Sequence, residues 1–201
     1  MRVGLLGGTF DPVHNGHLVI AERVRQRLNL DEVIFMPAGQ PRLRVNNPTP
    51  AAHRIQMVRL AIAGKPYFRL STREVERAGP TYTVDTIAEM RGQLDCRDEV
   101  FFILGWDSLA GLPRWREPSR IIEMCFLVAV PRPGSQCPDL SALEKLVPGL
   151  AGRVILLDAP HVDIRASEIR RRVTRGLPIR HLVPGPVADY IKQHGLYASK
   201  G

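Results

Sequence analysis

Residues 7–17 read Gly7-Gly8-Thr9-Phe10-Asp11-Pro12-Val13-His14-Asn15-Gly16-His17. The apolar run before this stretch predicts a buried strand, and the apolar residues after it recur at helical spacing. The residues concerned are Val3, Leu5 and Leu6 for the strand, and Leu18, Ala21, Val24 and Leu28 for the helix. Because glycines separate the two patterns, the sequence predicts a strand-to-helix turn here.

This turn has the features of a phosphate-binding site. Gly7 and Gly8 allow the backbone to approach a ligand with no Cβ in the way, and the free N–H groups that open a helix attract anions. His14 and His17 are three residues apart, so they lie on one helix face, where both can donate to the same phosphate oxygens. The alternative is a pair of histidines that only caps and packs the helix. The glycine turn directly upstream favours the phosphate site.

The same stretch resembles the signature of the adenylyltransferase and cytidylyltransferase superfamily. That signature is Gly-Thr-Phe-Asp-Pro, one residue, His, two residues, His, and the chain meets every defining position. The resemblance implies transfer of a nucleoside monophosphate from a nucleoside triphosphate to a phosphate-bearing acceptor, with release of pyrophosphate. It also implies a set of ATP-binding residues in this turn, namely Gly7, Gly8, Thr9, Phe10, His14 and His17.

Composition and charge narrow the class of protein. The chain has 201 residues with 44% hydrophobic content, which is enough for one core, and we expect residues 1–201 to form a single domain. A formal charge of +8 suits either nucleic acid or small polyphosphates. Only 6% of residues are aromatic, so platforms for stacking bases are few, and arginines such as Arg170 lie in an amphipathic helix. We therefore expect small nucleotides and no nucleic acid as partners.

Cysteine usage and hydropathy indicate a cytoplasmic protein. Cys96, Cys125 and Cys137 are odd in number and have no metal-binding spacing, which is typical of reduced thiols. Cys125 heads an apolar run and is expected in the core. The sequence shows no signal peptide and no apolar run near the roughly 18 residues of a membrane span. We expect a soluble, cytoplasmic protein with no membrane partner, and the sequence leaves open whether it forms a homo-oligomer.

Strand and helix patterns alternate along the rest of the chain. Further strands are expected over 32–36, 67–71, 100–104, 126–130 and 154–157. Helices are expected over 50–63, over 83–94 with Thr83 as cap, from near Pro118, through Leu146 with Ser141 and Glu144 as a capping box, over 166–174 and over 187–194. This alternation predicts an α/β fold, a doubly wound Rossmann-like parallel sheet with helices on both faces. Ligands of such sheets bind beyond the carboxyl ends of the strands.

A second motif follows the last predicted strand, at Ile164-Arg165-Ala166-Ser167-Glu168-Ile169-Arg170. It resembles the second superfamily motif, usually Ile-Ser-Ser-Thr, two residues and Arg. The resemblance implies that backbone amides and the final Arg170 hold the triphosphate, with Ile164, Ala166 and Ser167 among the ATP contacts. Arg165 and Ala166 replace the two serines, but backbone amides do not depend on the side chain, so the phosphate site is expected to survive.

The middle and the end of the chain resemble the nicotinate mononucleotide adenylyltransferase branch of this superfamily. The segments concerned are Gly79-Pro80-Thr81-Tyr82-Thr83-Val84-Asp85-Thr86, Leu104-Gly105-Trp106-Asp107-Ser108-Leu109, Leu112-Pro113-Arg114-Trp115, Arg132-Pro133-Gly134 and the closing residues 190–197. The resemblance implies that Trp115 stacks on the pyridine ring and that Tyr82 and Thr83 bind its carboxylate. It adds Gly105 and Asp107 to the ATP contacts, and Gly8, Thr9 and Arg132 to the acceptor contacts.

The chain departs from the branch at two places. Trp106 stands where a small residue is more common, and either narrows the nucleotide pocket or packs on the sheet. The loop after the second strand commonly reads Pro-Pro-His followed by Lys or Arg, whereas this chain has Pro41-Arg42-Leu43-Arg44. Arg44 keeps a cationic contact to the phosphates, but Leu43 cannot replace the histidine.

The reaction implied by the resemblance is transfer of AMP from ATP to nicotinate mononucleotide, which gives deamido-NAD and pyrophosphate in NAD biosynthesis. The attacking phosphate is already anionic, so no general base is required, and the expected catalytic donors are His14, His17, Arg44 and Arg170. We expect Mg²⁺ to arrive bound to the substrate, with no protein metal site.

Three alternatives to this reaction remain open. Nicotinamide mononucleotide or phosphopantetheine is an alternative acceptor within the class of adenylyltransferases. A basic nucleotide- or RNA-binding protein is the alternative without enzyme activity. An RNA-binding protein would show an RNA affinity that falls steeply with salt.

Overall fold

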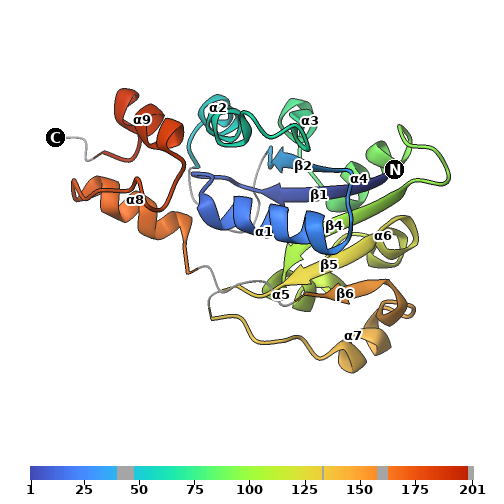
Figure 1. Cartoon of the computed structure of the whole chain (residues 1–201). Coiled ribbons are helices and arrows are strands. Elements are labelled where there is room, and N and C mark those ends of the chain that lie inside the picture. The colour runs from blue at the N-terminus through green and yellow to red at the C-terminus, as the bar shows by residue number, and fades with distance from the viewer. Residues whose placement is uncertain (40–47, 133, 158–162, 199–201) are drawn as a thin grey trace.

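The fold is described from a computed structural model, which covers residues 1–39, 48–132, 134–157 and 163–198. These residues form one parallel sheet of six strands in the order β3-β2-β1-β4-β5-β6 (Figure 1). The strands are β1 (Arg2–Gly8), β2 (Glu32–Pro37), β3 (Phe68–Leu70), β4 (Glu99–Gly105), β5 (Phe126–Val130) and β6 (Val154–Leu156). The chain leaves β1 toward β2 and later returns to its other side with β4, so the strand order reverses between β1 and β4. The predicted doubly wound parallel sheet is confirmed.

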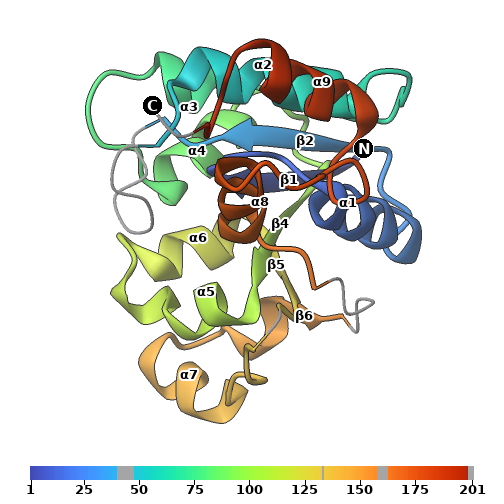
Figure 2. The same ribbon diagram turned by 90° about the vertical axis from the view of Figure 1, so that its left-hand side faces the viewer.

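Helices cover both faces of this sheet, as Figures 1 and 2 show. The helices whose apolar side chains pack on one face are α1 (Asn15–Arg27), α2 (Ala51–Ile62), α8 (Ala166–Thr174) and α9 (Gly185–Gln193). Those on the other face are α4 (Thr83–Arg91), α5 (Trp106–Ala110), α6 (Pro118–Met124) and α7 (Leu140–Leu146). Three shorter segments complete the described helices, namely α3 (Arg73–Glu76) and the 3₁₀ turns η1 (Leu112–Arg114) and η2 (Ala151–Arg153).

The strands separate these two layers because successive side chains point to opposite faces. In β4, Phe101 and Ile103 join the core beneath α1 and α2, whereas Phe102 and Leu104 join the core beneath α4 and α6. All four side chains are buried, which explains why the strand reads as one apolar run instead of an alternating one. Cys125 is buried in the second core, as predicted, and burial raises the pKa of its thiol to about 12.

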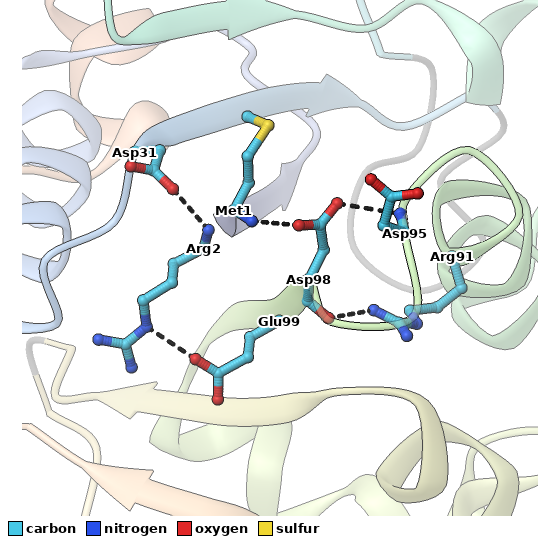
Figure 3. A network of polar contacts seen from close by, with 7 residues as sticks. All are labelled: Met1, Arg2, Asp31, Arg91, Asp95, Asp98 and Glu99. Carbon is cyan, nitrogen blue, oxygen red and sulfur yellow. Dashed lines mark hydrogen bonds and ion pairs between the residues drawn. The ribbon is translucent and has the colours of Figure 1, made fainter.

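A polar network joins the amino ends of β1 and β4 (Figure 3). The Asp98 carboxylate contacts the amino group of Met1 and accepts a hydrogen bond from the backbone N–H of Asp95. Arg2 donates its backbone N–H to Asp31 at 2.7 Å, and its Nε lies 2.9 Å from a carboxylate oxygen of Glu99. This network lies at the end of the sheet opposite the glycine turn.

Two expected helix caps are wrong. Tyr82, not Thr83, is the N-cap of α4, and Thr83 is the first helical residue. The cap of α7 is Asp139, whose Oδ1 accepts the N–H groups of Ser141 and Ala142 at 2.9 and 3.1 Å. Glu144 does not complete a capping box, because its carboxylate accepts backbone N–H groups in the turn that follows α7.

The short helix α5 is absent from the expected elements. It begins directly after β4, with Gly105 as its N-cap, and has only five residues. Five residues are too few to show a helical period, so the sequence pattern carried no signal for it. Its Leu109 and the following Leu112 are both fully buried, which anchors the turn to the sheet.

Candidate functional site

The glycine turn lies at the carboxyl end of β1, beside the point where the strand order reverses. Gly8 is the last residue of β1, and α1 begins at Asn15 with His14 as its N-cap. A Cβ on Gly8 would come within 3.1 Å of the Phe10 ring, so the absence of a side chain lets this ring fold back over the strand end. Phe10 itself adopts a left-handed conformation with φ of 51° and is buried. The predicted strand-to-helix turn is confirmed.

His14 and His17 lie against each other in this turn. Their rings stack with centroids 3.7 Å apart, and the Phe10 ring meets His17 edge-on at 5.0 Å. The backbone N–H of His14 donates to Nδ1 of His17 at 3.2 Å. An Nδ1 that accepts a hydrogen bond carries no proton, so this contact assigns the proton of a neutral His17 ring to Nε2.

Both imidazoles are neutral near pH 7. Burial, reinforced by the positive charge of Arg132, lowers the pKa of His14 to about 4. Burial also lowers the pKa of His17 well below its ordinary value, with further contributions from His14 and Arg132. The Nδ1 of His14 is buried and has no hydrogen-bond partner among the described residues. The His14 side chain faces the backbone N–H of His17, as in a capping box.

The second motif reaches the same turn from the other end of the chain. Arg170 extends from α8, and its Nη1 donates to the backbone oxygen of Asp11 at 2.6 Å. Arg165 is the N-cap of α8, Ala166 is its first residue, and Ser167 is exposed in its first turn. Ile164 precedes them and packs against the core beneath α1. The two motifs are 159 positions apart in sequence at this contact, and the fold brings them together.

The end of β4 adds a third group of predicted residues. Gly105 is crowded by its neighbours, since a Cβ there would lie 2.5 Å from Nε of Arg132 and from Oδ1 of Asp107. The Arg132 guanidinium lies 3.6 Å from the Asp107 carboxylate, and its charge acts on both histidines. Sequence reasoning assigned Arg132 to the acceptor. In the structure it lies beside Asp107, and its charge helps to lower the pKa of both histidines.

The residues predicted to bind the acceptor ring gather on the opposite face of the sheet. Trp115 and Tyr82 both pack at the edge of the core that contains Phe102, and the Trp115 ring meets Phe102 edge-on at 6.2 Å. Arg116, the residue after Trp115, places its guanidinium 4.7 Å from the centre of the Tyr82 ring. Thr83, at the start of α4, follows Tyr82 and is partly exposed.

Trp106 packs on the sheet, which is one of the two readings left open above. It is partly buried against the core that contains Phe102. Its indole N–H is buried and has no hydrogen-bond partner within the part of the chain that the structure describes. Arg44 and Leu43, in the loop after β2, lie outside the described residues.

Sequence reasoning missed two buried charged residues next to the turn. Asp11 is 3% exposed and Arg54 is 1% exposed. Arg54 projects from α2, and its Nη1 donates to the backbone oxygen of Thr9 at 2.9 Å. Asp11 was quoted within the motif without a role, and Arg54 falls on the apolar side of its helix pattern. An arginine on the apolar side of a helix indicates a buried charge, and charges are buried only when they are paired or hydrogen-bonded. This position was the signal in the sequence that could have identified Arg54.

Two negative findings concern metal and membrane. Among the residues that the structure describes, no group of three His, Cys, Asp or Glu side chains could hold a metal ion. No described helix combines the length and the apolar character that crossing a bilayer requires.

Comparisons with known proteins agree on one family. The cytidylyltransferase-like family model matches residues 5–172. A protein of Dehalococcoides mccartyi named probable nicotinate-nucleotide adenylyltransferase is 52% identical over 198 residues, which cover 98% of this chain and 97% of that protein. A protein of the same name from Thermomicrobium roseum is 47% identical, over 98% of this chain and 91% of its own. Among solved structures, the Plasmodium falciparum nicotinic acid mononucleotide adenylyltransferase complexed with NaAD has a TM-score of 0.78 at 21% identity, with 98% and 97% of the two chains covered.

Proposed function

The chain belongs to the cytidylyltransferase-like family and, within it, to the nicotinate-nucleotide adenylyltransferases, and we propose that it transfers AMP from ATP to nicotinate mononucleotide. The products are deamido-NAD and pyrophosphate. The observation that carries this assignment is the convergence of the stacked His14 and His17 with Arg170 at the carboxyl end of β1. These groups form an anion site at the reversal point of the sheet, where doubly wound folds bind nucleotides.

The proposed reaction is an in-line displacement at the α-phosphate of ATP. An oxygen of the acceptor phosphate forms the new bond to phosphorus, the bond to the bridging oxygen breaks, and pyrophosphate leaves with that electron pair. The enzyme has to hold two anions together and to stabilise charge that grows on the transferring and leaving groups. In this proposal the Nε2–H of His17 donates to phosphate oxygens, and Arg170 and the N–H groups that open α1 and α8 assist it.

The neutral histidines fit this task. Burial keeps the pair uncharged in the free protein, and two imidazolium rings with centroids 3.7 Å apart would also repel each other. A neutral ring still donates one N–H, and a triphosphate that binds beside the pair would favour its protonated form. The pair therefore supplies donors without opposing the folded state.

The remaining predicted contacts complete the proposal. Gly7, Gly8, Thr9, Phe10, Gly105 and Asp107, together with Ile164, Ala166 and Ser167, line the proposed ATP site, and Arg44 assists from a loop outside the described residues. Tyr82, Thr83 and Trp115 bind the pyridine ring and its carboxylate. We place Arg132 at the nucleotide, because it lies beside Asp107 and acts on the histidines.

Magnesium enters this proposal as part of the substrate. Mg²⁺ keeps several waters and prefers phosphate oxygens, so it is expected to travel with the triphosphate of ATP. The carboxylate nearest to the histidines in sequence, Asp11, already accepts hydrogen bonds from two protein groups. A cytoplasmic location stays a prediction, and the question of a homo-oligomer stays open.

The test measures pyrophosphate release from ATP with one acceptor at a time: nicotinate mononucleotide, nicotinamide mononucleotide and phosphopantetheine. We expect nicotinate mononucleotide to be preferred over the nicotinamide form by about tenfold or more. One or two hydrogen bonds to a charged carboxylate are worth roughly 1.5 to 3 kcal/mol each, and the amide loses that charge. Equal turnover of the two pyridine nucleotides would refute the acceptor assignment. If none of the three acceptors supports pyrophosphate release, the proposed function is wrong.

A further inference from the structure

The Asp11 carboxylate is held by two groups from distant parts of the chain. Its Oδ1 accepts the hydroxyl hydrogen of Tyr197 at 2.6 Å, and its Oδ2 accepts the backbone N–H of Thr49 at 3.1 Å. Burial and the charge of Asp11 raise the pKa of Tyr197, so its hydroxyl stays a donor at neutral pH. Short O–H···O⁻ hydrogen bonds of this kind are among the strong ones. Asp11, the last residue of segment 9–11, is therefore held by hydrogen bonds to both of its carboxylate oxygens.

Arg54 holds the other end of the same segment. Its Nη1 donates to the Thr9 oxygen at 2.9 Å, and its Nε donates to the Thr49 oxygen at the same distance. Burial lowers the pKa of Arg54, while the negative charge of Asp11 acts in the opposite direction. Asp11 therefore stabilises the guanidinium that fastens Thr9.

Tyr197 is also tied to the helix that carries Arg170. The hydroxyl of Thr174, one turn after Arg170 in α8, lies 2.9 Å from the backbone oxygen of Tyr197 and 3.0 Å from that of Arg170. The Arg170 side chain then returns to the backbone oxygen of Asp11. These contacts form a closed circuit between the glycine turn, α8 and the segment after α9. Figures 1 and 2 show α8 beyond the carboxyl end of β1, and α9 beside α2.

We propose that Tyr197 is a positioning residue for adenylyl transfer, which acts through Asp11 to set segment 9–11 and Arg170 against the histidine pair. The proposal rests on the function proposed above. Its physical basis is that phosphoryl transfer depends on placement more than on any covalent role of the protein, so a displacement of about 1 Å can cost roughly 100-fold in rate. Tyr197 does not itself need to touch either substrate.

The test compares Tyr197→Phe with a matched control, Tyr190→Phe. Each change removes one hydroxyl from a partly buried ring that packs on the same core, and the Tyr190 hydroxyl lies 2.9 Å from Nδ1 of His53 instead of contacting Asp11. We expect Tyr197→Phe to lower kcat roughly 10- to 100-fold with little change in the KM of the acceptor. The control should keep the kcat of the unaltered enzyme. Both variants should stay folded at the assay temperature, and Tyr197→Phe should melt somewhat lower because an oxygen of the buried Asp11 loses its donor.

Hydrogen exchange of the ligand-free protein supplies a readout that does not depend on activity. Backbone amides of residues 9–17 should exchange faster in Tyr197→Phe than in the unaltered protein, and Tyr190→Phe should leave them unchanged. An unaltered enzyme that releases no pyrophosphate would contradict the proposed function, and the exchange experiment would still decide whether Tyr197 positions the turn. Normal kcat in Tyr197→Phe, or equal exchange of residues 9–17 in all three proteins, would overturn the positioning role.

Discussion

At the scale of single residues, His17 is oriented from two sides. Its Nδ1 accepts the His14 backbone N–H, and Phe10 packs edge-on against its ring, so the Nε2–H has a defined direction. His17→Ala should lower kcat by about 10²- to 10³-fold and weaken ATP binding less, by analogy with the loss of one preorganised oxyanion donor. His17→Asn, which keeps an uncharged donor, should lie between Ala and the unaltered enzyme.

Steady-state kinetics and direct titration of ATP check this expectation. The fold should survive in both variants, because the buried residues of α1 are Gly16, Ala21 and Val24 and are untouched. A folded Ala variant with near-normal turnover would mean that the histidine only supports the start of α1.

The buried histidines also predict how stability depends on pH. Between pH 6.5 and about 4 the unfolded chain binds a proton at residue 14 that the folded chain does not bind, because the folded pKa of His14 is lowered to about 4. The free energy of unfolding is therefore unaffected by this histidine above pH 6.5. It decreases as the pH falls from 6.5 toward 4, by at most about 1.4 kcal/mol per pH unit. His14→Asn should remove this part of the acid destabilisation.

Urea unfolding at pH 7, 6 and 5 measures the effect. The free energy of unfolding of the unaltered protein should fall more steeply than that of His14→Asn over this range. Parallel pH dependences for the two proteins would show that His14 titrates normally in the folded state.

At the scale of elements, the N-cap of α7 is Asp139 and not the predicted Ser141. Asp139 accepts two backbone N–H groups at the start of the helix, whereas the Ser141 side chain lies inside the first turn. Asp139→Ala should lower the free energy of unfolding by about 1 kcal/mol, and Ser141→Ala should change it by only a few tenths. Thermal or denaturant unfolding of the two variants measures this difference. A larger decrease in the free energy of unfolding for Ser141→Ala would show that Ser141 caps the helix.

At the scale of the whole molecule, the proposed site spans both faces of the sheet at the carboxyl ends of its strands. The histidines begin α1 on one face, while Trp115 packs near Phe102 on the other. Trp115→Ala should raise the KM of the pyridine nucleotide far more than that of ATP, since only the pyridine loses a stacking surface. Trp115→Phe keeps an aromatic face and should recover part of the affinity.

Measurement of both Michaelis constants for each variant tests this division. An equal rise in the two constants for Trp115→Ala would indicate that the indole mainly supports the core beside Phe102. A folding defect would change both Michaelis constants and lower the melting temperature. Trp115→Phe, which keeps an aromatic ring in the core, is the control for such a defect.

Local sequence alone determined most of the elements and the positions of the glycine turn and the histidine pair. Runs such as Val100–Leu104 and the glycine turn before His14 are contiguous, so periodicity and spacing were sufficient to predict the parallel sheet, most of its helices and the histidine pair. Only the tertiary structure decided which distant groups complete the site. The Tyr197 contact to Asp11 joins residues 186 positions apart, and Arg54 reaches Thr9 from another helix. The same holds for the pKa values of His14 and His17, because burial is a property of the packed molecule that no local pattern encodes.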